Sequence, residues 1–234
     1  MSADSKGQRV DSDAGALTVL EIADDADAWA AAGFAVAEDR MVLDGVVFRF
    51  VGSGSADEAP ESDRRGIRRW HLTDIAVDGS DLDGLAGVAA PRVSGPAESE
   101  HPNGIDGIDH LVIATPNIER TIEAFERSGL AARRTRTFNL GSSERQQTFF
   151  WAGSTILEMI GVVGDQGEGP ATFWGLALVS PDLDATAAFL GDRCTPPKDA
   201  VQRGRRIATV ETELFDISVP LAVMTPHARR DQPE

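Results

Sequence analysis

The stretch His110-Leu-Val-Ile-Ala-Thr115-Pro-Asn-Ile-Glu119 decides the fold, because a similar stretch follows 65 residues later as Gly175-Leu-Ala-Leu-Val-Ser180-Pro-Asp-Leu-Asp184. In both copies an apolar run ends at Thr-Pro or Ser-Pro and continues into an acidic turn. We interpret the run as a strand and the junction as a helix start. Thr115 or Ser180 would cap the helix, and the proline would sit where its missing N–H costs no hydrogen bond. Repeated units are therefore expected.

The residues after each junction predict a helix and then further strands. Helices of about nine to twelve residues should begin near Pro116 and Pro181 and end at Gly129 and Gly191, because apolar side chains recur there on one helical face. The expected strands are residues 130–139, 146–152 and 154–163 in the first unit, and 174–179, 206–211 and 217–224 in the second.

The first half of the chain shows an eroded form of the same order. It predicts a strand at residues 17–22, a short helix closed by Gly33, a pair of strands within residues 41–52, and a second unit that starts with a strand and stops, truncated, near Asp83. The expected division is a disordered N-terminus at residues 1–16, the eroded half at 17–90, a linker at 91–104, a complete domain at 105–226 with units 105–163 and 170–226, and a tail at 227–234.

Composition excludes several classes of function. The chain has 38 acidic against 22 basic residues and a formal net charge of −16, which repels nucleic acid and anionic membrane surfaces. No apolar run approaches the length of a membrane-spanning helix, and the N-terminus lacks the apolar core of a secretory signal, so a cytoplasmic protein is expected. Cys194 is the only cysteine, so an intramolecular disulfide is excluded.

Three motifs carry a resemblance to a known family. Gly107-Ile-Asp-His110-Leu-Val-Ile with the helix after it, and Gly153-Ser-Thr-Ile-Leu-Glu158, resemble the paired signatures of glyoxalase-like proteins of the vicinal oxygen chelate superfamily. Phe173-Trp-Gly-Leu-Ala-Leu resembles the start of the family's second unit. The resemblance implies an α+β fold of repeated βαβββ units, whose curved mixed sheets enclose a cleft and carry the helices on the outside.

The same resemblance implies a site but leaves its chemistry open. His110 matches the family's histidine on the first strand and Glu158 its carboxylate on the fourth, so both are candidate metal ligands and Glu158 the candidate catalytic residue. Their equivalents in the second unit, Gly175 and either Ala222 or Val223, carry no ligand atom. One hypothesis is a lyase, isomerase or dioxygenase assisted by a divalent Mn, Fe, Ni or Zn ion. The alternative is a metal-free protein that binds or sequesters a small molecule, as bleomycin-resistance proteins do.

Further residues are weaker candidates. His71 would complete a set of two histidines and one carboxylate with His110 and Glu158, if the first half folds over the second. Arg49, which aligns with Glu158, and the two tryptophans are candidate ligand-binding residues, although tryptophans are more often core. The tryptophans are Trp151 and Trp174. The expected partners are a small-molecule ligand and a second copy of the chain in a homodimer.

The orientation of Glu158 is the sharpest expectation. Because strand side chains alternate between faces, Leu157 and Met159 should pack beneath the helix and leave Glu158 on the cleft side, within reach of His110. The structural alternatives are a hydrogen-bonded histidine that binds no metal and a buried ion pair between Glu158 and an arginine. Asp109 is expected to face solvent.

Overall fold

The computed structural model describes residues 15–52, 65–73, 75, 81–89 and 99–227. The expected N-terminal disorder, most of the linker at 91–104 and most of the tail therefore lie outside the described residues. Among the described helices, none combines the length and apolar character needed to cross a membrane.

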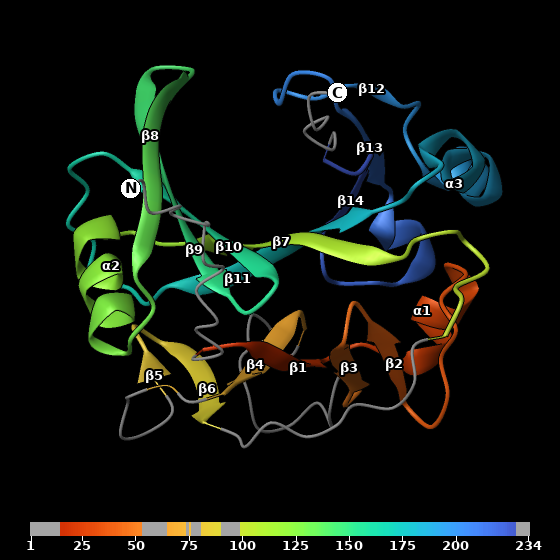
Figure 1. Cartoon of the computed structure of the whole chain (residues 1–234), viewed down its shortest axis with the longest axis horizontal. Helices are drawn as coiled ribbons and strands as arrows, with labels where there is room; N and C mark the ends of the chain where they lie inside the picture. The colour runs from red at the N-terminus through yellow and green to blue at the C-terminus, as the bar shows by residue number, and fades with distance from the viewer. Residues whose placement is uncertain (1–14, 53–64, 74, 76–80, 90–98, 228–234) are drawn as a thin grey trace, which may run out of the picture.

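The described strands form two sheets, each with parallel and antiparallel neighbours (Figure 1). The first, ordered β2-β3-β1-β4-β6-β5, contains β1 (Leu17–Ile22), β2 (Arg40–Leu43), β3 (Val46–Phe50), β4 (Ile67–Leu72), β5 (Asp81–Leu82) and β6 (Leu85–Ala89). The second, ordered β12-β13-β14-β11-β7-β10-β9-β8, contains β7 (Gly107–Ala114), β8 (Ala132–Leu140), β9 (Ser143–Ala152), β10 (Thr155–Val162), β11 (Thr172–Val179), β12 (Lys198–Asp199), β13 (Arg206–Val210) and β14 (Leu221–Met224). The helices are α1 (Ala26–Ala31), α2 (Ile118–Arg127) and α3 (Leu183–Leu190), with short 3-10 turns at η2 (Gly191–Arg193) and η3 (Thr212–Phe215).

The eight-stranded sheet consists of two βαβββ units, which confirms the expected fold class. They are β7-α2-β8-β9-β10 and β11-α3-β12-β13-β14. In each unit the first strand pairs in parallel with the last, and the two first strands pair antiparallel at the centre of the sheet. The sheet curves into a trough, with β8 and β9 rising on one side and β12 and β13 on the other, and α2 and α3 lie outside it (Figure 1). The inner surface of this trough is called the concave face below.

Both long helices begin at the predicted places, but the prediction of their capping residues is wrong. The N-caps are Asn117 and Asp182, whose side chains accept hydrogen bonds from backbone N–H groups of the first turn at 3.1 and 3.0 Å. Thr115 and Ser180 instead accept from the backbone N–H groups of Asn117 and Asp182, and so order the turn before the helix. Helix α2 has 10 residues, and α3 has 8 before it tightens into η2.

The six-stranded sheet repeats a shorter pattern. Strands β1, β2 and β3 with α1 form one unit, and β4, β5 and β6 form another in which β6 runs parallel to β4, as β3 does to β1. The prediction that the second unit stops near Asp83 is wrong. Asp83 and Gly84 adopt positive φ angles of 56° and 92°, and this turn returns the chain as β6.

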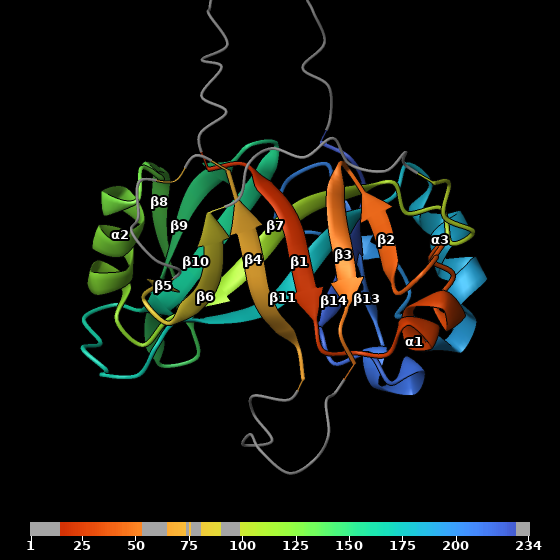
Figure 2. The ribbon, with the colours of Figure 1, turned by 90° about the horizontal axis from the view of Figure 1, so that it is seen from below.

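The two sheets pack back to back around a shared core. Leu20 and Trp70 from the first sheet belong to the same buried cluster as Leu111 and Leu157 from the second. The Trp70 ring lies 5.9 Å from the Phe125 ring of α2, which joins the layers. Figure 2, seen from the side of the six-stranded sheet, shows this sheet in front of the other. The concave face and the outer face of the six-stranded sheet consequently point away from each other.

Candidate functional site

Two rows of side chains cross the concave face. In one row, Ile156, His110, Ala177 and Ala222 are successive register partners, and Trp151 precedes Ile156. In the adjacent row the order is Phe149, Glu158, Val112 and Gly175. Residues between these positions, such as Leu111 and Leu157, belong to the core between the sheets. The sheet therefore places His110 and Glu158 on its concave face, in neighbouring rows.

His110 and Glu158 lie side by side, as the expected register requires. Their Nε2 and Oε2 atoms are 3.5 Å apart, and the side chains are 14% and 11% exposed. Leu157 and Met159 are fully buried on the opposite face. The other carboxylate oxygen of Glu158 accepts a hydrogen bond from the amide nitrogen of Gln147. The alternative of an arginine ion pair is not found for Glu158 in the described part of the chain.

Asp109 is buried, so the expectation that it faces solvent is wrong. Its Oδ1 lies 2.7 Å from Nδ1 of His110, and its Oδ2 accepts a hydrogen bond from Arg205. The cause is a β-bulge. The register of β7 against β11 shifts between the pairs Ala177–His110 and Leu178–Ile108, which leaves Asp109 as the extra residue. A bulge interrupts the alternation of faces, so adjacent side chains can contact each other.

Arg205 holds Asp109 from the second unit. Its side chain is 3% exposed, and it also donates to the Thr225 carbonyl and to Gln202. Burial acts to raise the pKa of Asp109, but hydrogen bonds from His110 and Arg205 and the charges of these groups outweigh it and lower the pKa to about 2. Asp109 is therefore ionised at neutral pH. His110 donates its Nδ1–H to this carboxylate, and its Nε2 faces the carboxylate of Glu158.

A second arginine fixes the other end of the site. Nε of Arg136 donates to Oε1 of Gln147 at 2.6 Å, and this contact turns the Gln147 amide so that its NH₂ group faces Glu158. The Arg136 guanidinium also lies 5.5 Å from the centroid of the Phe149 ring. A continuous polar chain thus crosses the concave face. It comprises Arg136, Gln147, Glu158, His110, Asp109 and Arg205.

The other sequence-predicted site residues lie elsewhere or at the edge. His71 and Arg49 contact Glu21 on the outer face of the six-stranded sheet, at 3.3 and 3.0 Å. Trp70 points into the core, so alternation along β4 turns His71 away from the eight-stranded sheet. The set of His71, His110 and Glu158 is therefore not formed.

Both candidate tryptophans reach the surface, so the core alternative is wrong for them. Trp151 is 47% exposed and lies in the His110 row. Trp174 is 60% exposed and lines a separate cavity of about 280 Å³ with Arg65 and Pro220. Of the candidate ligand-binding residues, Trp151 therefore lies on the strands that carry His110 and Glu158 and their neighbours, whereas Arg49 lies on the other sheet.

The donor atoms present do not fit a metal site of the kind that the family resemblance implies. In the register of the sheet Leu111 pairs with Leu157 and Leu176 with Leu221, which makes Ala222 the counterpart of Glu158. A Cβ atom at Gly175 would lie 2.6 Å from the Pro220 carbonyl oxygen, so this position is closed to a ligand side chain. Among the described residues, no three His, Cys, Asp or Glu side chains gather closely enough to hold a metal ion.

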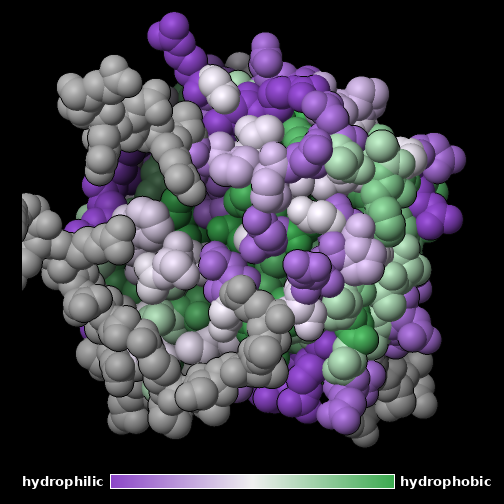
Figure 3. Space-filling model, turned by 45° about the vertical axis from the view of Figure 1, so that its right-hand side comes forward, coloured by the Kyte–Doolittle hydropathy of each residue, from purple (hydrophilic) through white to green (hydrophobic). Residues whose placement is uncertain are grey.

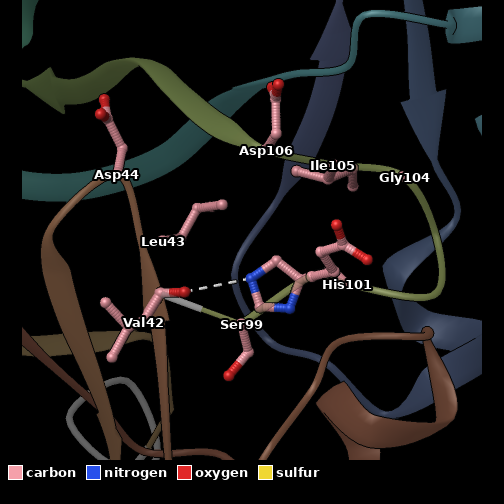
Figure 4. Close-up of a pocket in the computed structure, with 9 residues that line it drawn as sticks. Val42, Leu43, Asp44, Ser99, His101, Gly104, Ile105 and Asp106 are labelled. Carbon is pink, nitrogen blue, oxygen red and sulfur yellow. Dashed lines mark hydrogen bonds between the residues drawn. The ribbon is translucent and has the colours of Figure 1, made fainter. Parts of the chain in front are cut away.

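A larger pocket of about 560 Å³ lies between the β2–β3 turn and the segment at residues 99–106 (Figure 4). The His101 ring stands in it and points at Val42 in that view. Nδ1 of His101 accepts from the Ala35 N–H at 2.9 Å, so Nε2 carries the proton and donates to the Val42 carbonyl at 3.1 Å. Both ring nitrogens are thereby used in joining the first half to the segment before β7. None of the sequence-predicted site residues lines this pocket.

Among the comparisons with known proteins, the likeness to one solved structure supports the fold. No family model matches the sequence, and no curated protein matches it. A solved structure of a triple mutant of 4-hydroxymandelate synthase from Streptomyces coelicolor superposes with a TM-score of 0.64 at 10% identity, over 94% of this chain and 94% of that chain. Methylmalonyl-CoA epimerase from Mycobacterium tuberculosis gives a TM-score of 0.42 at 15% identity, over 54% of this chain and 91% of that chain. The first likeness covers 94% of each chain, so this chain shares the overall fold of that structure, in agreement with the repeated βαβββ units described above.

Proposed function

We propose that the protein binds a small organic molecule on the concave face, with His110 and Glu158 as its polar contacts. One observation carries this proposal. Asp109 holds His110 from one side and Gln147 holds Glu158 from the other, so both groups are oriented before any ligand arrives. Polar groups fixed in this way lose little freedom on binding, which favours affinity.

The side chains around the pair favour an apolar ligand with a hydrogen-bond donor. Phe149 and Trp151 supply aromatic surface on one side of the pair, and the side chains in the His110 row on the other side are small and apolar. These small residues are Ala177 and Ala222. The carboxylate oxygens of Glu158 are hydrogen-bond acceptors, so a hydroxyl or amine group of the ligand can donate to them.

This proposal places the chain with metal-free binding proteins rather than with metal-dependent enzymes. The second candidate is metal-assisted lyase, isomerase or dioxygenase chemistry. It is favoured by the contact between Asp109 and His110, because histidines that bind metals commonly donate their other ring N–H to a carboxylate. The two candidates differ in a simple measurement. Stoichiometric metal in protein purified without chelator, lost in His110→Ala, would favour the second.

The binding proposal is tested with the variant Glu158→Gln and the matched control Glu123→Gln, which makes the same change on the exposed surface of α2. Wild type and variants are screened against small aromatic compounds that carry hydroxyl or amine groups, by thermal shift and tryptophan fluorescence. We expect Glu158→Gln to weaken binding severalfold while changing stability by no more than about 1 kcal/mol, and the control to bind as wild type does. Unfolding of Glu158→Gln, with unchanged binding by the folded fraction, would assign Glu158 to the structure alone.

A further inference from the structure

We propose that the outer face of the six-stranded sheet carries an anion-binding site formed by Arg40, Arg49 and Arg69, which takes a carboxylate or phosphate group of a small molecule. This arginine site lies on the opposite side of the molecule from His110 and Glu158. It is independent of the function proposed for the concave face.

The arginines belong to one row across four neighbouring strands. Arg40 of β2 is the register partner of Arg49 of β3, Arg49 is the partner of Glu21 of β1, and Glu21 is the partner of Arg69 of β4. Register partners share a face of the sheet. Phe48, next to Arg49, and Trp70, next to Arg69, are buried in the core. The row therefore faces outward, on the side of the sheet seen in Figure 2.

Glu21 orients two of the arginines. Its Oε1 accepts from Nη1 of Arg49 at 3.0 Å, and its Oε2 from Nη1 of Arg69 at 3.4 Å, while His71 lies 3.3 Å from Oε1. The Glu21 side chain is 13% exposed, whereas those of Arg49 and Arg69 are 49% and 50% exposed. The carboxylate thus lies beneath the guanidinium groups. Their remaining N–H donors form no hydrogen bond with any residue that the structure describes, and we expect them to meet a ligand from solvent.

The charges of the row are unbalanced. Three arginines face one carboxylate in a chain whose net charge is −16. Arg40 forms no ion pair with any residue in the described part of the chain, yet it lies directly opposite Arg49, and like charges in such cross-strand positions lower stability. An oxyanion between the two guanidinium groups would remove this repulsion. The planar guanidinium also matches the oxygens of carboxylates and phosphates in geometry.

The position in the fold supports a binding role. Strands β1 and β3 pair in parallel as β7 and β10 do, with Glu21 opposite Arg49 in the first pair and Val112 opposite Glu158 in the second. Arg49 and Glu158 thus occupy the same position on the last strand of their units. This position holds a carboxylate on the concave face and a guanidinium on the outer face of the six-stranded sheet. At this one position of the repeated unit, the two sheets carry side chains of opposite charge on their outward faces.

The test uses inorganic phosphate and malonate as separate probes, titrated into the full chain against chloride at equal ionic strength. Melting temperature and heat of binding are measured for wild type, Arg40→Gln, Arg49→Gln and the control Arg127→Gln, an exposed arginine of α2. At least one anion should stabilise wild type and the control. The probe that binds more tightly shows whether the site prefers a phosphate or a carboxylate group. Arg40→Gln and Arg49→Gln should bind about tenfold more weakly or worse, the effect of losing one charged hydrogen-bond donor.

The proposal of an anion site fails if neither anion stabilises wild type beyond chloride. It also fails if Arg40→Gln binds the anions as well as Arg127→Gln does. A second measurement separates binding from folding. In chloride alone Arg40→Gln should melt no lower than wild type, because the substitution removes the repulsion with Arg49 and breaks none of the ion pairs between described residues. A lower melting temperature would assign Arg40 a structural role instead.

Discussion

Asp109 offers the most direct test of the polar chain, because its contribution to stability depends on pH in a predictable way. The substitution Asp109→Asn keeps the size of the side chain and removes its charge. It leaves the guanidinium of Arg205, which is 3% exposed, without an anion. Removing one partner of a buried ion pair typically costs about 3–5 kcal/mol, so the variant should be less stable than wild type by this amount at pH 7.

The pH dependence follows from the lowered pKa of Asp109. The pKa falls from 3.8 to about 2 on folding, a difference worth about 2.5 kcal/mol. Since the folded state binds the proton more weakly than the unfolded state, this stabilisation is fully present above about pH 4 and is lost as the pH falls through about 2. About half of it should be gone at pH 3. The stability gap between wild type and Asp109→Asn should therefore narrow by about 1 kcal/mol between pH 7 and pH 3.

Urea unfolding followed by tryptophan fluorescence at pH 7, 5, 4 and 3 measures this gap. Carboxylates elsewhere titrate in both proteins and cancel in the difference. Asp165→Asn, the same change at an exposed position, serves as control and should stay close to wild type at every pH. A gap of constant size from pH 7 to pH 3 would refute the assignment of Asp109 as an ionised partner of Arg205 and His110.

Three further outcomes are expected. Gly175→Ala should lower the free energy of unfolding in urea by about 1–3 kcal/mol, because the new Cβ would lie 2.6 Å from the Pro220 carbonyl oxygen. In the control Gly169→Ala the nearest contact of the new Cβ is at 3.7 Å, so the loss should be less than half as large. Asp24→Ala should lower the free energy of unfolding by about 2–4 kcal/mol, because the buried Asp24 accepts hydrogen bonds from the Trp29 indole and from Ser218 in the other half of the chain. An unchanged midpoint of urea unfolding would contradict this contribution of Asp24. Dialysis against a chelator should leave the melting temperature unchanged, and a fall of several degrees would show a metal that contributes to stability.

Much of the fold was predictable because it rests on short-range regularities. The Thr-Pro and Ser-Pro junctions predicted where both long helices begin. The alternation of side chains along two strands predicted that Glu158 lies beside His110. These inferences need only the period of a strand or helix and one correct register. The caps were missed by two residues, because the hydroxyls of Thr115 and Ser180 bond within the turn instead of starting the helix.

The supports of the site could not be predicted, because they depend on contacts between distant parts of the chain. Arg205 is 96 residues from Asp109, and only the folded sheet brings them together. In the sequence, nothing distinguishes Gln147 from other polar residues of a strand. Its role depends on the hydrogen bond from Arg136, which orients its amide group. The bulge that lets Asp109 reach His110 leaves no local mark in the sequence, since its neighbours keep an apolar strand pattern.

The repeat explains where the asymmetry of the site comes from. The register of β11 against β7 shifts a second time between Phe173 and Gly175, so Trp174 is a bulge residue in the second unit as Asp109 is in the first. The backbone thus supplies the same irregularity twice. In the first unit the bulge carries a buried carboxylate that orients His110. In the second it carries an exposed indole, next to a glycine that has no room for a side chain. The geometry of the fold is therefore repeated, whereas His110 and Glu158 both belong to the first unit. The ligand that we propose for the concave face would meet these polar groups on one side and small apolar side chains on the other.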